Sequence, residues 1–171
     1  MTTVFKALPN GTFLGPNIKF KCALGRGGMI AANEKNEGVG ASPIGVWPLR
    51  RIFYRKDKIT PPTTELPLVP IREHDGWCDD PSDPLYNRPI SIPYSASHEK
   101  MWRDDDVYDI VVELGHNDDP PVPGLGSAIF LHLARENYRS TEGCIALSET
   151  DLRAMLKLAG KDAALEICGP N

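Results

Sequence analysis

Alternating hydrophobic and polar positions predict several short β-strands in this chain. In 17–24 the apolar side chains occupy every second position, which is typical of a strand with one buried face. The runs 107–114 and 127–134 are rich in β-branched and aromatic residues and predict strands that are buried more deeply. The run 163–168 predicts a further strand close to the end of the chain.

One convincing helix is predicted after residue 148. Ser148 suits the N-cap position, and Asp151 three residues later completes a pair that resembles a capping box. The apolar positions then follow helical spacing, at Leu152, Met155, Leu156 and Ala159. Gly160 marks the end of the helix.

Proline and glycine set the fold class. The 16 prolines and 15 glycines are spread through most of the chain, which divides it into short segments and nearly excludes long helices. We therefore predict a mainly β, sandwich-like fold with one main helix. A length of 171 residues suits one domain, residues 1–171, better than two.

The proline-rich and polar segment 61–94 is predicted to form a long ordered loop. A loop of this length in a compact domain is usually functional or disordered. Trp77, Tyr86 and Tyr94 favour an ordered, packed loop that walls a substrate groove.

Charge and hydropathy exclude two classes of partner. The net charge is −4 and the basic residues are scattered, so we expect no nucleic-acid partner. No run of 18 apolar residues is present, so we expect no membrane insertion. The first 15 residues lack the basic and apolar regions of a secretory signal, and the residues alone therefore leave the localisation open.

The four cysteines are spaced too irregularly for a zinc site, and we expect no structural metal. Cys22 and Cys168 are predicted to be core residues. Cys78 is either a second reactive group or a loop residue shielded by Trp77, and the sequence does not distinguish these two possibilities. The aspartates at 104–106 are more typical of a solvated turn than of a cation site.

Cys144 and His132 are the candidates for chemistry. A cysteine is a good nucleophile when its thiolate is favoured and a base takes its proton. His132, at the end of a predicted strand, is the nearest base, although either residue alone is more often structural. Gly143 allows a tight turn that presents backbone N–H groups to a substrate carbonyl.

These residues lie in a stretch with a family resemblance. The stretch "HLARENYRSTEGCIAL" resembles the active-site motif of the YkuD-type L,D-transpeptidases, in which a histidine precedes Ser/Thr-His-Gly-Cys. Upstream, "NEKNEGVGASPIGVWPL" is similar to the "EGDGxTPxGxF" stretch of that family. The stretches "ALGRGGM", "WCDDPSDPLYN" and "HEKMWRDDDVYDIVVELGHN" resemble a compact bacterial branch of it, so that the resemblance covers about 20–158.

The resemblance implies a role for four positions. Cys144 matches the acyl-accepting nucleophile and His132 the general base. Thr141 matches the Ser/Thr whose backbone carbonyl orients that base, and the N–H groups of Gly143 and Cys144 match the oxyanion hole.

Two positions depart from the family motif. Glu142 replaces the usual histidine, and a carboxylate there raises the pKa of the thiol unless it is turned away or paired with Arg103, Arg135 or Arg139. Alternatively, Glu142 binds the ammonium group of an amine acceptor. Ala146 replaces a usual arginine.

The missing arginine implies that the donor stem is recognised by other residues, for which Arg103 and Arg26 are the candidates. His98, His116 and Tyr138 are further candidates for lining the substrate cleft.

The implied reaction is acyl transfer between peptidoglycan stem peptides through a cysteine thioester. The cross-link is either 3,3, between two meso-diaminopimelate residues, or 1,3, between L-Ala and meso-diaminopimelate, as in divergent members. The resemblance implies no cofactor, a place in the periplasm or cell envelope, and carbapenems as covalent inhibitors. Two alternatives stay open: a cysteine carboxypeptidase or amidase, and a non-catalytic wall-binding module.

Overall fold

In the computed structural model, which describes residues 2–170, the chain is mostly β. The strands are β1 (Val4–Ala7), β2 (Thr12–Gly15), β3 (Ile18–Lys21), β4 (Met29–Ala31), β5 (Ser42–Tyr54), β6 (Leu68–Pro70), β7 (Asp75–Cys78), β8 (Pro89–Ser91), β9 (His98–Lys100), β10 (Ile110–Leu114), β11 (Phe130–Leu133), β12 (Ile145–Leu147) and β13 (Ala164–Ile167). The helix α1 spans Glu149–Leu158, and two short 3₁₀ turns, η1 and η2, span Ala32–Glu34 and Glu136–Tyr138. No helix within residues 2–170 is long and apolar enough to cross a membrane.

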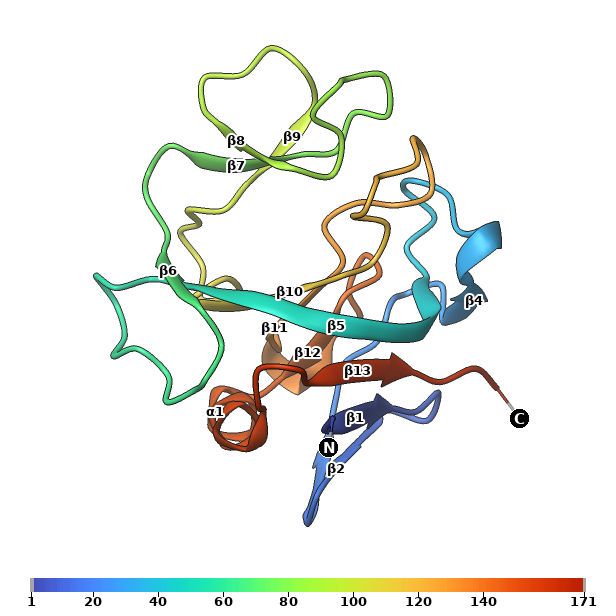
Figure 1. Ribbon diagram of the computed structural model, residues 1–171, viewed down its shortest axis with the longest axis vertical. Helices are drawn as coiled ribbons and strands as arrows, with labels where there is room; N and C mark the ends of the chain where they lie inside the picture. Colours follow the sequence, from blue (N-terminus) through green and yellow to red (C-terminus); the bar gives the residue numbers. More distant parts are fainter. Residues whose placement is uncertain (1, 171) are drawn as a thin grey trace.

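The main sheet has ten strands and is organised around β5. Eight strands follow the order β12-β11-β10-β5-β13-β1-β2-β3, and β4 and β6 also pair with β5. Figure 1 shows β5 running across the middle of the molecule, with β13 and the β1–β2 hairpin on one side of it. Because β5 has 13 residues, it is long enough to pair with four other strands.

The two ends of this strand order meet. An antiparallel bridge joins Ala23, just after β3, to Ala146 in β12. A parallel bridge joins Gly25 to Thr141. The sheet is thereby nearly closed on itself, and the segment after β3 lies directly against the turn that contains Cys144.

A second sheet, of three strands in the order β8-β7-β9, lies over the opposite side of β5 (Figure 1). The segment 61–94, predicted as one long ordered loop, is ordered but contains β6, β7 and β8. Strands of three or four residues between prolines and aspartates are too short to show a period of two, which is why the sequence did not reveal them. Trp77 is 3% exposed and Tyr86 is equally buried.

The helix α1 confirms the sequence prediction. The Ser148 hydroxyl accepts a hydrogen bond of 3.2 Å from the backbone N–H of Asp151. Leu152, Met155 and Leu156 are fully buried in the larger hydrophobic core, which the inner faces of the main sheet complete.

The strand predictions are confirmed in type, with shorter bounds. The predicted strands at 107–114 and 127–134 begin only at Ile110 and Phe130, because a turn precedes β10 and the positive φ of Ala128, 53°, interrupts the extended backbone before β11. The strand β5 is not apparent from the sequence, since Pro43, Gly45 and Pro48 interrupt its hydrophobic pattern.

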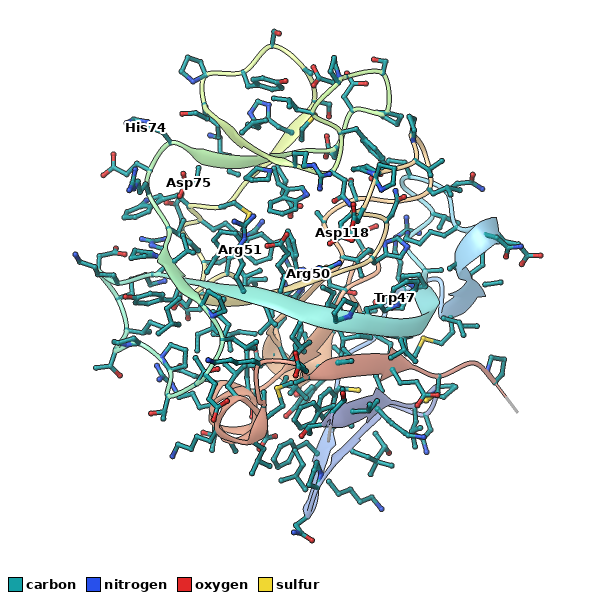
Figure 2. All side chains as sticks on the ribbon, in the orientation of Figure 1. Trp47, Arg50, Arg51, His74, Asp75 and Asp118 are labelled. Carbon is teal, nitrogen blue, oxygen red and sulfur yellow. The ribbon has the colours of Figure 1, made fainter. Side chains whose placement is uncertain are left out.

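The loop that follows β10 is clamped to β5. Arg50 donates hydrogen bonds of 2.9 and 3.1 Å to the two carboxylate oxygens of Asp118, and both residues are labelled in Figure 2. This ion pair fixes one end of the loop that leads to the segment before β11.

Candidate active site

Cys144 lies at the end of a tight turn that leads into β12. The Thr141 hydroxyl donates to the Cys144 carbonyl at 2.6 Å and accepts from the Gly143 N–H at 3.1 Å. Gly143 has a φ of 129°, and a Cβ there would lie 3.0 Å from the Ala41 carbonyl oxygen. The turn therefore requires glycine, and the Thr141 hydroxyl holds it closed.

The thiol of Cys144 is 8% exposed and has two backbone partners. Its Sγ donates to the Ala128 carbonyl at 3.2 Å and accepts from the Phe130 N–H at 3.4 Å. Burial, followed by the negative charge of Glu99, raises the pKa of the thiol to about 12. The resting side chain is therefore a protonated thiol.

His132, on β11, is 6% exposed and lies against the ring of Tyr108, with 5.4 Å between ring centroids. Burial lowers its pKa to about 4, so the imidazole is neutral at pH 7. Its Nδ1 is 3.0 Å from the Leu133 carbonyl, and donation to that oxygen leaves Nε2 as the basic nitrogen. Within residues 2–170 no hydrogen bond directly joins the side chains of His132 and Cys144.

The contact predicted for the Thr141 carbonyl is not seen in the structure. That oxygen accepts the backbone N–H of Arg26 at 2.8 Å and makes no hydrogen bond with His132 among the described residues. The imidazole is oriented by Leu133 instead, because this carbonyl follows His132 directly in the chain. Thr141 contributes its hydroxyl, through the turn described above.

Cys144, His132 and Thr141 share one pocket of about 290 Å³. Its charged lining consists of four carboxylates and two guanidinium groups, from Glu37, Asp79, Glu99, Glu142, Arg103 and Arg135. The pocket therefore combines a thiol, a neutral imidazole and charges of both signs.

Three of the carboxylates were missed by sequence reasoning. Glu37 accepts hydrogen bonds from the hydroxyls of Tyr86, at 2.5 Å, and Ser127, at 2.9 Å. Glu99 accepts from the Tyr108 hydroxyl, and burial raises the pKa of its carboxyl. Asp79 has one buried oxygen with no hydrogen-bond partner in the described part of the chain. Their only sequence signal is that all three lie in stretches that carry the family resemblance.

The two guanidinium groups differ in how free they are. Arg103, as expected, lines the pocket, but it binds the carboxylate of Asp105 with hydrogen bonds of 2.8 and 2.6 Å. This pairing lowers the pKa of Asp105 to about 2. Arg135 is exposed at the pocket and makes no ion pair with any described residue, so its charge is available to a substrate.

Glu142 pairs with a cation that sequence reasoning assigned to another role. The expected partners were Arg103, Arg135 and Arg139, but the Arg26 Nε binds Glu142 Oε2 at 2.8 Å. Arg26 does not line the pocket itself but binds Glu142, which does, and its role in donor recognition stays a prediction. The Gly25–Thr141 bridge puts Arg26 beside the Cys144 turn and outside the pocket.

The remaining predicted cleft residues also lie outside the pocket lining. His98 is next to Glu99 on β9, and successive strand residues face opposite sides, so only Glu99 points to the pocket. His116 is 3% exposed and contacts Trp47 edge-on at 4.9 Å. The Tyr138 ring lies 5.0 Å from the Nζ of Lys21.

The other cysteines and the aspartate run have structural surroundings. Cys22 and Cys78 are buried, whereas Cys168, predicted as a core residue, is only half-buried. Burial raises the pKa of the Cys78 thiol, which agrees with a shielded residue. In the run 104–106, Asp105 pairs with Arg103, and Asp106 pairs with Lys58 at 2.8 Å. Residues 2–170 contain no cluster of side chains suited to a metal ion.

Comparison with known proteins gives the family. The model of the L,D-transpeptidase catalytic domain (YkuD) matches residues 4–167. No curated protein sequence matches the chain. Among solved structures, L,D-transpeptidase 1 of Mycobacterium tuberculosis is similar over 98% of this chain and 62% of that one, with 12% identity and a TM-score of 0.42.

An L,D-transpeptidase of Mycobacterium smegmatis is similar over 98% of this chain and 58% of its own, with 10% identity and a TM-score of 0.43. The chain thus spans about three fifths of these two structures. Because the family model matches nearly the whole chain, this protein belongs to the YkuD family of L,D-transpeptidase catalytic domains.

Proposed function

We propose that this protein is a cysteine-dependent peptidoglycan L,D-transpeptidase in which Cys144 is the nucleophile and His132 the general base. The observation that carries the proposal is the meeting of a thiol and a neutral imidazole in one pocket of a YkuD domain. A neutral imidazole accepts a proton, whereas an imidazolium does not.

In the first half of the reaction, His132 takes the thiol proton as Sγ attacks a carbonyl of the donor stem peptide. The Cys144 N–H, joined by the Gly143 N–H once it leaves the Thr141 hydroxyl, stabilises the negative oxygen of the tetrahedral intermediate. The intermediate collapses as the C–N bond breaks, and His132 returns the proton to the leaving amine. The product is a thioester on Cys144.

In the second half, the amine of an acceptor stem attacks the thioester. His132 accepts the proton of the attacking nitrogen, a new amide bond forms, and the Cys144 sulfur leaves and is reprotonated. The net reaction exchanges one amide bond for another, so that no cofactor or external energy source is needed.

The charges of the pocket suit this pair of substrates. Arg135 and Arg103 match carboxylates of the donor stem, and Glu37, Asp79 and Glu99 match the ammonium group of an amine acceptor. Glu142 is a further candidate for the ammonium group, because it also lines the pocket. The donor carbonyl belongs to residue three of the stem in a 3,3 cross-link and to residue one in a 1,3 cross-link.

The wider assignments follow from the family and are part of the same proposal. YkuD domains act on the cell wall, so we place this protein in the cell envelope, in the periplasm, with peptidoglycan stem peptides as partners. Residues 1–171 would form one catalytic domain. A carbapenem would acylate Cys144 covalently.

The test is intact-mass spectrometry of the protein with disaccharide-tetrapeptide and its dimers, for the wild type and Cys144→Ala. Cross-linked dimers made only by the wild type support transpeptidation, and their fragmentation distinguishes a bond from residue one from a bond from residue three. Shortened monomers alone indicate hydrolysis, as in a carboxypeptidase or amidase. The absence of any product that depends on Cys144 overturns the proposal in favour of a wall-binding module.

A further inference from the structure

Asn87 is a buried side chain that joins the three-stranded sheet to the segment before β11. It is 4% exposed. Its Oδ1 accepts hydrogen bonds from the Trp77 indole N–H, at 2.9 Å, and from the Ala128 backbone N–H, at 3.0 Å. Its Nδ2 donates to the carbonyls of His116, at 3.2 Å, and Asn117, at 2.7 Å. All the hydrogen-bonding capacity of this amide is therefore used.

Ala128 is held in an unfavourable backbone conformation. Its φ is 53°, in the left-handed region that residues with a Cβ rarely adopt. A backbone strained in this way persists only where surrounding contacts enforce it. The hydrogen bond from Ala128 N–H to Asn87 is such a contact, and it reaches Ala128 from a distant part of the chain.

The carbonyl of the same residue is the acceptor for the thiol proton of Cys144. The backbone conformation of Ala128 sets the orientation of the peptide group between Ala128 and Ile129, and this orientation decides where Sγ–H points. The Phe130 N–H, two residues further on, is the second partner of Sγ. Asn87 thus lies two hydrogen bonds away from the sulfur and lines no part of the pocket.

We infer that Asn87 is a positioning residue for the nucleophile. Through Ala128 it fixes the direction of the Cys144 S–H bond, and through Trp77 it links this direction to the position of the three-stranded sheet. This inference rests on the proposed role of Cys144. Asn87 itself touches neither the substrate nor the reacting atoms.

The first test is Asn87→Ala, with two rates measured on the folded protein. One is alkylation of Cys144 by iodoacetamide at pH 9, followed by peptide mapping, and the other is acyl-enzyme formation with the disaccharide-tetrapeptide. The hydrogen bond to the Ala128 carbonyl stabilises the protonated thiol, so the loss of this hydrogen bond in Asn87→Ala is expected to speed alkylation by about threefold or more. The thiol is no longer held in one orientation, so the rate of acyl-enzyme formation is expected to fall about tenfold or more.

These opposite changes separate positioning from simple destabilisation. Cys22 is an internal control, because it is also buried and burial raises its pKa to about 12 as well. Asn117→Ala is the matched variant, since it removes three hydrogen bonds from the neighbouring loop but none to Ala128. Equal acceleration at Cys22, or the same pair of changes in Asn117→Ala, overturns the inference.

A rescue experiment completes the design. Ala128→Gly in the Asn87→Ala background removes the steric cost of the left-handed backbone and is expected to restore at least half of the lost acylation rate. If Asn87→Ala does not fold, Asn87→Ser is measured in its place, because its shorter side chain does not reach Ala128. Wild-type rates in a folded Asn87 variant refute the inference. If the wild type forms no acyl-enzyme, the proposed function fails, while the alkylation rates still decide whether Asn87 controls the thiol.

Discussion

At the scale of single residues, the pocket keeps the Cys144 thiol and the His132 imidazole neutral. Burial removes the stabilising effect of water on a charge, so it raises the pKa of Cys144 and lowers that of His132. A pre-formed thiolate–imidazolium pair is therefore not the resting state, and in the proposed mechanism the proton moves as the substrate carbonyl is attacked. Glu142, which was expected from the sequence to raise the pKa of the thiol, is largely exposed and paired with Arg26.

Glu99 is expected to influence the thiol more than Glu142. After burial, the charge of Glu99 is the next cause that raises the pKa of Cys144, whereas Glu142 contributes less. Glu99→Gln keeps an acceptor for the Tyr108 hydroxyl and removes the charge. We expect it to speed alkylation of Cys144 at pH 9 roughly three- to tenfold, and Glu142→Gln less than about twofold. Equal effects of the two variants would contradict the assignment of Glu99 as the main charge that raises the pKa of Cys144.

His116 is expected to make the protein less stable in mild acid. Burial, followed by the charge of Lys35, lowers the pKa of His116 from 6.5 to about 4. The unfolded chain then binds more protons than the folded one between these values. Stability contributed by the neutral imidazole is full above pH 6.5 and is lost as the pH falls toward 4. The loss amounts to up to about 3 kcal/mol.

The measurement is the free energy of unfolding in urea at pH 7.0 and at pH 4.5, for the wild type and His116→Gln. The difference between the two pH values should be smaller in the variant. Comparing the variant with the wild type cancels the contribution of the carboxyl groups to the pH dependence. Some carboxyl groups, such as Glu113, have raised pKa values, so their contribution to stability increases as the pH falls. An unchanged difference would contradict a buried neutral His116.

At the scale of elements, α1 combines a local start signal with tertiary packing. Ser148 satisfies a free backbone N–H at the helix start, and three apolar side chains on one face are fully buried. The helix follows β12 directly, so it anchors the strand that follows Cys144.

Ser148→Ala is expected to lower the free energy of unfolding by about 1 kcal/mol, the usual cost of losing an N-cap. Met155→Ala, which opens a cavity in the core beneath the same helix, should cost about 2–5 kcal/mol. Urea unfolding measures both. Ser148→Thr, which keeps a hydroxyl at the cap, is the control and should remain within about 0.5 kcal/mol of the wild type.

At the scale of the whole molecule, two hydrophobic cores meet at the active site. The larger lies between α1 and the main sheet, and the smaller joins the three-stranded sheet to β5, β10 and β11. Cys144 belongs to the smaller core, together with Trp77 and Phe130. The site is therefore built where the second sheet covers the first.

Trp77→Ala is expected to cost about 3–5 kcal/mol, because it empties the centre of the smaller core. The Trp77 ring contacts Phe53 and Phe130 edge-on, with centroid distances of 6.2 and 5.1 Å. The matched control is Trp102→Ala, in which the lost ring is only half-buried beneath the Arg55 guanidinium. A similar loss of stability in the two variants would contradict the central place of Trp77.

The sequence by itself determined the features that depend on neighbouring residues. These are the helix after Ser148, the type of four strands, and the cysteine motif that identifies the family. Each rests on local spacing or on a contiguous stretch, so it can be recognised without the fold. Cys144 and His132 were also identified together as candidates from the residues, and the motif agreed.

Only the tertiary structure decided which charged side chains surround the thiol. Glu37, Asp79 and Glu99 come from distant segments, and no local pattern predicts their meeting. The pairing of β7 with β9 brings Asp79 close to Glu99, and the hydroxyls of Tyr86 and Ser127 hold Glu37. The bridge between Gly25 and Thr141 likewise puts Arg26 beside Glu142. All of these contacts join segments that are distant in the sequence, so no local pattern predicts them.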